Sequence, residues 1–386
     1  MPPSPLPLET NGASPLRIAL VTEYYYPHLG GVCEHVHFFA RVARQLGHHV
    51  DIITSWIPGT APRPNVVQLG RSVPWYINGS QSRLTVGRTL RRDMRHALRD
   101  GNYDIVHVHS PLTPVLPLLA IAEAEVPVVG TFHTYFDYSV GYRTFQRAFQ
   151  KRLNKLSAAI AVSQSTIVAL ERYFDADWKI IPNGIDTDLF RPDAARPPEI
   201  RGDVPAILFL GRFDPRNGLS TLIDAFKRVK GRGRRAQLVV VGDGPLRRHY
   251  YRQAANDPDI TFVGAVLKGR PGYYANSAMY ACPTTKASFG ITLLESMACA
   301  APIVCSDILG FRDVVVHGRE ALMVPRDDHD ALANGLVHLL DNESLRARLG
   351  ETGRRRAAEY DWRRVSAQVL EVYDDVLGRT RVPALS

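Results

Sequence analysis

The 386-residue chain is poor in cysteine, with only Cys33, Cys282, Cys299 and Cys305, and it has no Cys-x-x-Cys pair. The spacings typical of zinc sites and of dithiol redox sites are therefore missing. The last three cysteines lie in apolar runs, which favours buried, reduced thiols. This cysteine usage is typical of a cytoplasmic protein.

Long apolar runs are also missing. The longest, such as residues 115–122, are far too short to cross a bilayer. Residues 1–15 are rich in proline and lack a basic start followed by an apolar stretch, so we expect a disordered leader and no signal peptide. If the protein meets a membrane, it does so from the surface, for example at the inner face of the plasma membrane.

Acidic residues are outnumbered, with 38 Asp and Glu against 47 Lys and Arg, which gives a net charge of +9. Such an excess favours an anionic partner, which leaves nucleotides, acidic lipids and nucleic acids open. The hydrophobic content of 45% is enough for full cores, and the length predicts two domains.

Apolar strand-like segments alternate with helical patterns in the first half of the chain. Because buried apolar strands separated by helices are typical of a parallel sheet covered on both faces, we expect a doubly wound domain over residues 16–193. Ligands bind such sheets at the carboxyl ends of their strands. The expected strands are Arg17–Thr22, His49–Thr54, Asp104–His109, Val126–Thr131 and Ala158–Val162.

A second series of strands follows a break. Residues 194–205 are rich in proline, alanine and charge, and are predicted to be a linker. The fold class predicted is therefore α/β, with two facing Rossmann-like doubly wound domains, the second over residues 206–361. A cleft between the domains is the expected active site. The second set of strands is Ala206–Leu210, Gln237–Val241, Thr261–Val263, Met279–Cys282 and Pro302–Cys305.

The segment 286–298 (K-A-S-F-G-I-T-L-L-E-S-M-A) predicts an anion site. It joins the strand ending near Cys282 to a helical pattern, and the first N–H groups of a helix lack internal partners and face the positive end of its dipole. A diphosphate is expected over Ser288–Ile291. Glu295, about one turn further, would then accept hydrogen bonds from sugar hydroxyls.

Three further loops follow strands and can approach a ligand. Gly30 and Gly31 open the first helical pattern, and Gly242 lies in a G-D-G-P turn. Arg212 follows the first strand of the second domain, where a guanidinium can clamp a diphosphate. Each glycine pair is also compatible with a plain turn.

Histidines end two strands of the first domain. His133, in T-F-H-T, follows the fourth strand and would point into the expected cleft, where an imidazole can bond a sugar hydroxyl. His109, in H-V-H, ends the third strand and is a weaker candidate near an acceptor. For an isolated histidine a structural role is the ordinary alternative.

Two further kinds of pattern, acidic pairs and basic stripes, bear on metal binding and membrane binding. Three Asp-x-Asp strings, at 175–177, 186–188 and 257–259, do not follow apolar strands and are predicted to be turns and caps, so no metal is expected. Two basic stripes at helical spacing fit either an anionic lipid surface or a solubilising outer face. They consist of Arg88, Arg92, Arg95 and Arg99, and of Arg143, Arg147, Lys151 and Lys155.

The ordered set of motifs resembles retaining glycosyltransferases of family 4 (group 1), which have the GT-B fold. The set is the Gly-Gly loop, F-H-T, N-G-I-D, G-R-F-D, G-D-G-P, S-F-G-I-T-L-L-E and a final Y-D-W helix, and it covers about residues 17–380. The resemblance implies a nucleotide-diphosphate sugar as donor, no metal, and a final helix over 362–380 that packs back on the first domain. It implies His133 and Arg212 as catalytic residues. The donor residues would be Gly30, Gly31, Arg212, Arg216, Gly242, Lys286, Ser288, Phe289, Gly290, Ile291 and Glu295.

The chain departs from the family pattern at two donor positions. Ala287 replaces the first of two glutamates, and Asn217 replaces a lysine, for which Arg216 is a substitute. These departures leave three alternatives: a transferase with a retuned donor site, a catalytically degenerate protein that binds a nucleotide or glycolipid, and a nucleotide-sugar epimerase.

The segment 78–84 (N-G-S-Q-S-R-L) closely resembles one in phosphatidylinositol mannosyltransferases, where a basic helix follows and meets the membrane. This resemblance implies Tyr24, Asn78 and Arg83 as contacts to a polar or phosphorylated acceptor. The expected activity is transfer of a hexose to a glycolipid or another hydroxyl acceptor. We expect no nucleic acid partner.

Overall fold

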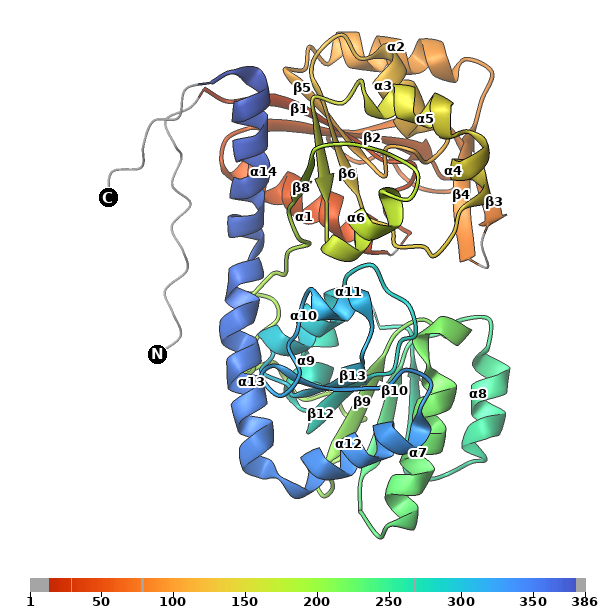
Figure 1. Ribbon diagram of the computed structural model, residues 1–386, viewed down its shortest axis with the longest axis vertical. Helices are drawn as coiled ribbons and strands as arrows, with labels where there is room; N and C mark the ends of the chain where they lie inside the picture. Colours follow the sequence, from red (N-terminus) through yellow and green to blue (C-terminus); the bar gives the residue numbers. More distant parts are fainter. Residues whose placement is uncertain (1–13, 29, 78–79, 267, 380–386) are drawn as a thin grey trace, which may run out of the picture. The chain divides into compact units, whose positions relative to one another are not determined.

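The computed structural model describes residues 14–28, 30–77, 80–266 and 268–379 (Figure 1). The chain forms two compact units, unit 1 up to Asn183 together with the residues from Trp362 onward, and unit 2 from Gly184 to Asp361. Each is an α/β unit built on a parallel sheet, so the predicted fold class is confirmed. The division falls before the predicted linker, because Phe190 already packs against Tyr274 of unit 2.

Unit 1 contains an eight-stranded sheet in the order β4-β3-β2-β1-β5-β6-β7-β8. Its pairs are parallel except for the β3–β4 hairpin at one edge. Strands β1 and β5 are buried along nearly their whole length, as the apolar runs predict. The strands are β1 (Arg17–Val21), β2 (His49–Trp56), β3 (Val66–Ile77), β4 (Ser80–Val86), β5 (Ile105–His109), β6 (Val128–Phe132), β7 (Ala158–Ala161) and β8 (Trp178–Ile180).

Two hydrophobic cores cover the faces of this sheet. One joins β1 and β5 to α1 and to the C-terminal helix α14, and the other joins them to α2 and α3 (Figure 1). The final helix therefore belongs to unit 1. The helices of the unit are α1 (Gly31–Gln45), α2 (Leu90–Asp100), α3 (Leu116–Glu123), α4 (Val140–Thr144), α5 (Gln146–Leu153), α6 (Gln164–Leu170) and α14 (Trp362–Leu377).

Unit 2 contains a six-stranded parallel sheet in the order β11-β10-β9-β12-β13-β14. The order reverses between β9 and β12, which is the topological switch point where doubly wound sheets bind ligands. Its strands are β9 (Ala206–Leu210), β10 (Gln237–Val241), β11 (Ile260–Gly264), β12 (Met279–Cys282), β13 (Ile303–Ser306) and β14 (Ala321–Val324).

The helices of unit 2 cover this sheet, and α7 and α12 contribute many side chains to one large core. They are α7 (Leu219–Gly231), α8 (Arg247–Ala254), α9 (Arg270–Ala275), α10 (Ile291–Ala298), α11 (Leu309–Arg312), α12 (His329–Asp341) and α13 (Glu343–Ala357), with 3₁₀ turns η1 (Pro215–Asn217) and η2 (Ala358–Tyr360). Among the helices of the described residues, none is both long and apolar enough to span a bilayer.

Candidate functional site

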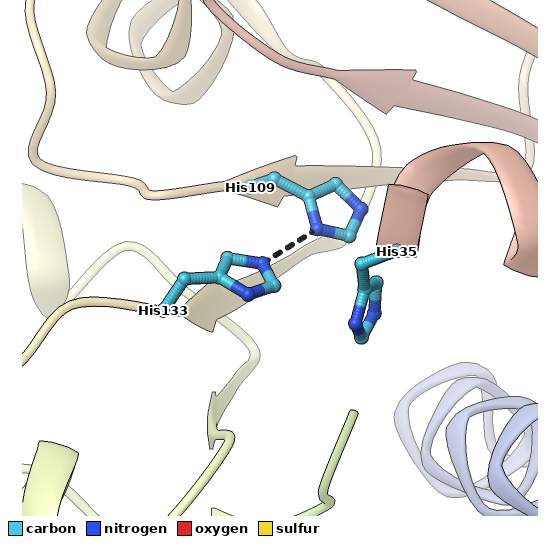
Figure 2. Close-up of side chains that lie close together, drawn as sticks. All are labelled: His35, His109 and His133. Carbon is cyan, nitrogen blue, oxygen red and sulfur yellow. Dashed lines mark hydrogen bonds between the residues drawn. The ribbon is translucent and has the colours of Figure 1, made fainter. Parts of the chain in front are cut away.

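Three histidines from separate elements meet at the carboxyl ends of β5 and β6 in unit 1. His109 is the last residue of β5, His133 follows β6, and His35 lies in the second turn of α1 (Figure 2). His109 Nδ1 and His133 Nε2 are 3.1 Å apart and share a hydrogen bond. The predicted residue His133 therefore lies against a second histidine, whose own Nε2 is buried without a partner.

His35 holds the other side of His133. Its ring meets the rings of His133 and Trp362 edge to face, with centroids 4.8 and 4.9 Å apart. His35 Nδ1 is 2.9 Å from Asn183 Oδ1, which fixes the proton on Nδ1 because an amide oxygen only accepts. No sequence pattern indicated this pairing, because the two residues are 148 positions apart.

A fourth histidine extends the cluster toward α14. His107 stacks on His109 with ring centroids 4.4 Å apart. Its Nδ1 is 2.6 Å from the hydroxyl of Tyr373, and its Nε2 is 2.7 Å from the hydroxyl of Thr131. We call His35, His107, His109 and His133 the histidine cluster.

Burial keeps the histidine cluster neutral. Loss of hydration lowers the pKa of His35 to about 4 and that of His107 to about 3. The pKa values of His109 and His133 also lie well below 6.5, because of burial and, second, of the neighbouring imidazoles. At neutral pH His133 is therefore an uncharged group that can donate one hydrogen bond and accept another.

Three members of the histidine cluster are also the candidate ligands for a metal ion. Within the described part of the chain, His35, His109 and His133 form the group that could hold one, with ligand atoms within 4.8 Å of one another. Nitrogens around a tetrahedral zinc ion lie about 3.4 Å apart, given Zn–N distances near 2.0–2.1 Å. His109 Nδ1 and His133 Nε2, at 3.1 Å, are near this spacing, but they are joined to each other by a hydrogen bond that an ion would have to replace. The fit is poor, and metal independence remains a prediction.

The Asp-x-Asp strings serve as turns and caps where the structure describes their bonds. Asp186 Oδ1 accepts the N–H groups of Asp188 and Leu189. Asp257 Oδ1 accepts the N–H of Asp259, and both carboxylates pair with Lys230.

Two of the acceptor candidates, Tyr24 and Arg83, lie around His28. The rings of Tyr24 and His28 meet edge to face at 6.5 Å. Burial and, second, the charge of Arg83 lower the pKa of His28. Arg83 Nε also donates to the hydroxyl of Ser72 on β3. The third candidate, Asn78, lies outside the described residues.

The structure adds Glu23 to this region, which sequence reasoning missed. Its carboxylate accepts N–H groups from Val115 and Leu116, each at 2.8 Å, and from Thr85. It thus ties strand β4, which carries Arg83, to the start of α3. Burial raises the pKa of Glu23, and these hydrogen bonds oppose the rise.

His109 has a different environment from the one expected of an acceptor contact. Its side chain is fully buried. In this conformation it contacts His107, His35 and His133, and it reaches an acceptor only if the cluster opens.

In unit 2, the loop after β9 is braced from within. Asn217 Nδ2 donates to the carbonyl of Arg212 at 2.7 Å, so the amide that replaces a lysine holds the loop's backbone. Arg212 is exposed. The carbonyl of Arg216 accepts the N–H of Thr285 at 2.7 Å, which ties this loop to the segment before α10. The Arg216 guanidinium lies 3.3 Å from Asp214 and is largely exposed.

Gly242 is needed where the loops after β9 and β10 meet. Its φ is +141°, and a Cβ there would lie 1.9 Å from the carbonyl oxygen of Gly211. Only glycine fits such a close approach of two backbones. The fold itself therefore requires glycine at position 242, whether or not Gly242 also contacts the donor as predicted.

The loop before α10 has the geometry of an anion site. Helix α10 begins at Ile291 after Gly290, whose φ is +149°. Lys286 and Ser288 are half-buried, whereas Phe289 is buried and packs against Tyr360. The loop therefore offers backbone N–H groups at a helix start, with a lysine nearby.

Glu295 on α10 is bound by two neighbours. Arg270 Nη1 lies 3.0 Å from its Oε1, and the Tyr274 hydroxyl donates to its Oε2 at 2.8 Å. The side chain is 1% exposed. Ribose contact would therefore require access to a buried carboxylate that already bonds Arg270 and Tyr274. Arg270 and Tyr274 carried no sequence signal.

The glycine loop of unit 1 opens α1. Gly30 is exposed, and a Cβ there would meet nothing within 4 Å. Its carbonyl accepts the N–H of Glu34, and Gly31 is the first helical residue. Packing does not require glycine at position 30. Close approach of the backbone to a ligand is a reason for glycine there.

The basic stripe predicted on α2 is largely paired with acids. The helix begins at Leu90, so Arg88 precedes it. Arg95 bonds Glu123, and Arg99 bonds Glu125 at 2.6 Å. Arg92 lies 3.5 Å from Asp93.

Comparisons with known proteins agree with this architecture. Residues 29–189 match the model of Glycosyltransferase Family 4, and residues 204–342 match that of Glycosyl transferases group 1. The phosphatidyl-myo-inositol mannosyltransferase of Mycobacterium tuberculosis is 36% identical, over 94% of this chain and 98% of its own length. A GDP-mannose-dependent α-(1-6)-phosphatidylinositol monomannoside mannosyltransferase of the same species is 26% identical, over 92% and 97%.

Solved structures show the same fold. A glycosyltransferase from Rickettsia africae superposes with a TM-score of 0.75 at 19% identity, over 94% of this chain and 99% of its own. Anabaena HepE in complex with UDP-glucose gives 0.73 at 18% identity, over 93% and 99%. The fold is GT-B, and the chain belongs to the family 4, group 1 glycosyltransferases.

Proposed function

We propose that this glycosyltransferase moves mannose, with retention of configuration and without a metal, from a nucleotide-diphosphate sugar to a phosphatidylinositol-like lipid. The observation that carries the proposal is the 36% identity to phosphatidyl-myo-inositol mannosyltransferases over 94% of the chain. The second relative uses GDP-mannose by name, which favours GDP as the nucleotide.

In this proposal unit 2 holds the leaving group. The bond between the anomeric carbon and the diphosphate oxygen breaks, and negative charge grows on the diphosphate. Arg212 and the N–H groups at the start of α10 stabilise that charge, with Lys286 and Arg216 nearby. Glu295 orients the ribose once the nucleotide enters. Gly242 leaves room for close approach of the donor.

Unit 1 supplies the sugar and acceptor contacts. The acceptor hydroxyl attacks from the face that the diphosphate leaves, and the departing phosphate takes its proton. His133, neutral because it is buried, bonds a sugar hydroxyl through a nitrogen and does not act as an acid. Tyr24 and Arg83, grouped around His28, would contact the polar acceptor head.

The sugar end of the donor site is the altered end. Ala287 offers no carboxylate to a sugar hydroxyl, and Asn217 is occupied with the Arg212 carbonyl. These two features are what favour the second candidate function, a protein that binds the nucleotide without transfer. The acceptor lipid places the enzyme at a membrane surface, and we propose a cytoplasmic protein attached peripherally to the inner face of the plasma membrane.

The test is a panel of nucleotide sugars, including GDP-mannose and UDP-glucose, incubated with phosphatidylinositol vesicles. We expect nucleotide release, a mannolipid detected by mass spectrometry, and an α-anomeric signal by NMR, all unchanged by EDTA. Loss of turnover with EDTA would contradict metal independence. Tight nucleotide binding without turnover on any donor would favour the binding protein instead.

A further inference from the structure

The most exposed large apolar side chains gather in one short segment of unit 1. Val140, Phe145 and Tyr138 are 66%, 59% and 52% exposed, the three highest values among the large hydrophobic side chains of the described residues. They lie at α4 and at the turn into α5. We call residues 138–155 the α4–α5 hairpin.

The α4–α5 hairpin also carries unbalanced positive charge. Residues 140–155 contain five basic residues and no Asp or Glu. Within the part of the chain that the structure describes, none of the five forms an ion pair; Arg143 bonds the hydroxyl of Tyr138. The five are Arg143, Arg147, Lys151, Arg152 and Lys155.

The apolar and basic side chains are arranged for a flat partner. On α5, Phe149 and Leu153 face the core with Phe174, whereas Arg147 and Lys151 lie one turn apart and are exposed. Phe145, at the turn, meets the ring of Phe149 edge to face at 6.4 Å, and most of its own side chain stays exposed. Exposed aromatic and aliphatic residues beside a basic stripe are the composition of a helix that lies in a membrane interface.

The contrast with α2 decides between the two basic stripes. On α2, Arg91 and Arg95 share Glu123, and Arg99 pairs with Glu125. Its buried residues, Leu90, Met94 and Leu98, belong to the core of the unit. Helix α2 thus presents partly neutralised charge and no large apolar side chain to solvent, whereas the α4–α5 hairpin presents both free charge and apolar surface.

A cleft of about 400 Å³ continues this surface. Its lining includes Arg152 and Lys155 of the hairpin, Arg91 of α2, and the apolar residues Val115, just before α3, and Leu118 and Leu119 of α3. Cations around an apolar cleft complement an anionic lipid, whose phosphate stays at the rim while its chain meets the floor.

We propose that the α4–α5 hairpin is the surface that binds anionic phospholipid bilayers, with Phe145 and Val140 in the interface and the five cations on lipid phosphates. The inference rests on the proposed function only in that a lipid acceptor requires a membrane contact. An anionic bilayer, rather than a protein, is favoured because every charged side chain of residues 140–155 is positive and because the most exposed apolar side chains lie beside them.

The experiment is flotation of the full chain with vesicles of phosphatidylcholine alone or with phosphatidylglycerol. The double variant Arg147→Glu/Lys151→Glu should lower partition onto anionic vesicles about tenfold or more, since each basic residue near the surface contributes about 1 kcal/mol. Phe145→Ser should lower partition several-fold, because it removes an apolar side chain from the interface. The matched control, Arg88→Glu/Arg92→Glu before and on α2, should change partition less than threefold.

A separate readout distinguishes this proposal from the proposed function. With a water-soluble, short-chain phosphatidylinositol as acceptor, both double variants should transfer at the wild-type rate. Absence of all transfer would contradict the proposed function and leave the flotation result readable. The membrane proposal is overturned if the α2 variant loses binding while the α5 variant keeps it, or if the wild-type chain binds no anionic vesicle.

Discussion

The two units carry opposite kinds of site. The histidine cluster of unit 1 is uncharged and buried except for His133, which is half-buried, and its members bond one another or nearby hydroxyl and amide groups. The loops after β9 and before α10 in unit 2 expose Arg212 and Arg216 and leave Lys286 half-buried. One region is preorganised by packing, and the other is held by backbone bonds such as that from Thr285 to Arg216.

The difference fits two chemical tasks. A diphosphate is strongly hydrated and highly charged, so it is best met by accessible cations and helix N-termini. A sugar hydroxyl is neutral and is best placed by a rigid neutral group. Substitutions in the cluster should therefore affect transfer, and substitutions in the unit 2 loops should affect nucleotide binding.

The largest effect should come from His133→Ala, because it removes the neutral hydrogen-bonding group from the sugar site. We expect the transfer rate to fall about 10³-fold, the upper end of the range of about 10²–10³ for loss of one preorganised hydrogen-bonding group. The measurement is mannolipid formation at saturating donor. A rate within threefold of wild type would remove His133 from the mechanism.

Arg212→Ala should weaken the other region. Loss of a guanidinium from a developing oxyanion costs about 10²–10³ in rate, so we expect a fall of about 10²-fold in transfer and weaker binding of the nucleoside diphosphate. Arg216→Ala is the matched control, since Arg216 is exposed and paired with Asp214, and should cost less than tenfold. Equal losses of transfer rate in both variants would show that Arg212 does not stabilise the leaving diphosphate more than Arg216 does.

Acidification should weaken unit 1 through its buried histidines. Because the pKa values of His35 and His107 in the fold, about 4 and about 3, lie below the ordinary 6.5, the unfolded chain binds more protons below pH 6.5. Their contribution to stability is complete above pH 6.5 and is lost progressively toward pH 4. We expect a loss of about 1 kcal/mol per histidine between pH 6.5 and 5.5, measured by thermal unfolding.

The control for this prediction is His35→Asn, which keeps a donor for Asn183. Its unfolding midpoint should depend less on pH than that of the wild type over the same range. An unchanged pH dependence would mean that His35 is not buried in its neutral form.

The smallest effect should come from Asn217→Lys, which restores the charge that the family pattern has. We expect nucleoside diphosphate affinity to rise about two- to fivefold, because the gain of a cation is opposed by loss of the bond to the Arg212 carbonyl. Calorimetric titration checks this. Weaker binding in the variant would show that bracing of Arg212 outweighs charge.

The sequence predicted those strands and helices whose buried residues form a regular apolar pattern along the chain. Apolar strands such as Ala206–Leu210 and the helix Trp362–Leu377 agree with the structure. The β3–β4 hairpin was missed because β4 is largely polar and because Gly70, Arg71 and Pro74 interrupt the apolar run of β3, and β14 was missed because its run is short. The predicted basic stripe from Arg143 to Lys155 is broken, since α4 ends before Phe145.

The candidate site was predictable only where motifs mark it. His133 and Arg212 stand at strand ends in recognisable segments. Glu23, Asn183 and Arg270 act through partners distant in sequence, as in the bond of Asn183 to His35 148 residues away, and no periodicity reports such pairings. Pairing with acids likewise decided which basic stripe is free, because Glu123 and Glu125 come from outside α2.

The division of tasks between the two regions is tested most directly by the affinity of His133→Ala for GDP, measured by calorimetry on the same preparation that is assayed for transfer. The account predicts a dissociation constant within about threefold of wild type beside the lost transfer. A tenfold or greater loss of GDP affinity would contradict it, because His133 would then serve nucleotide binding rather than the sugar.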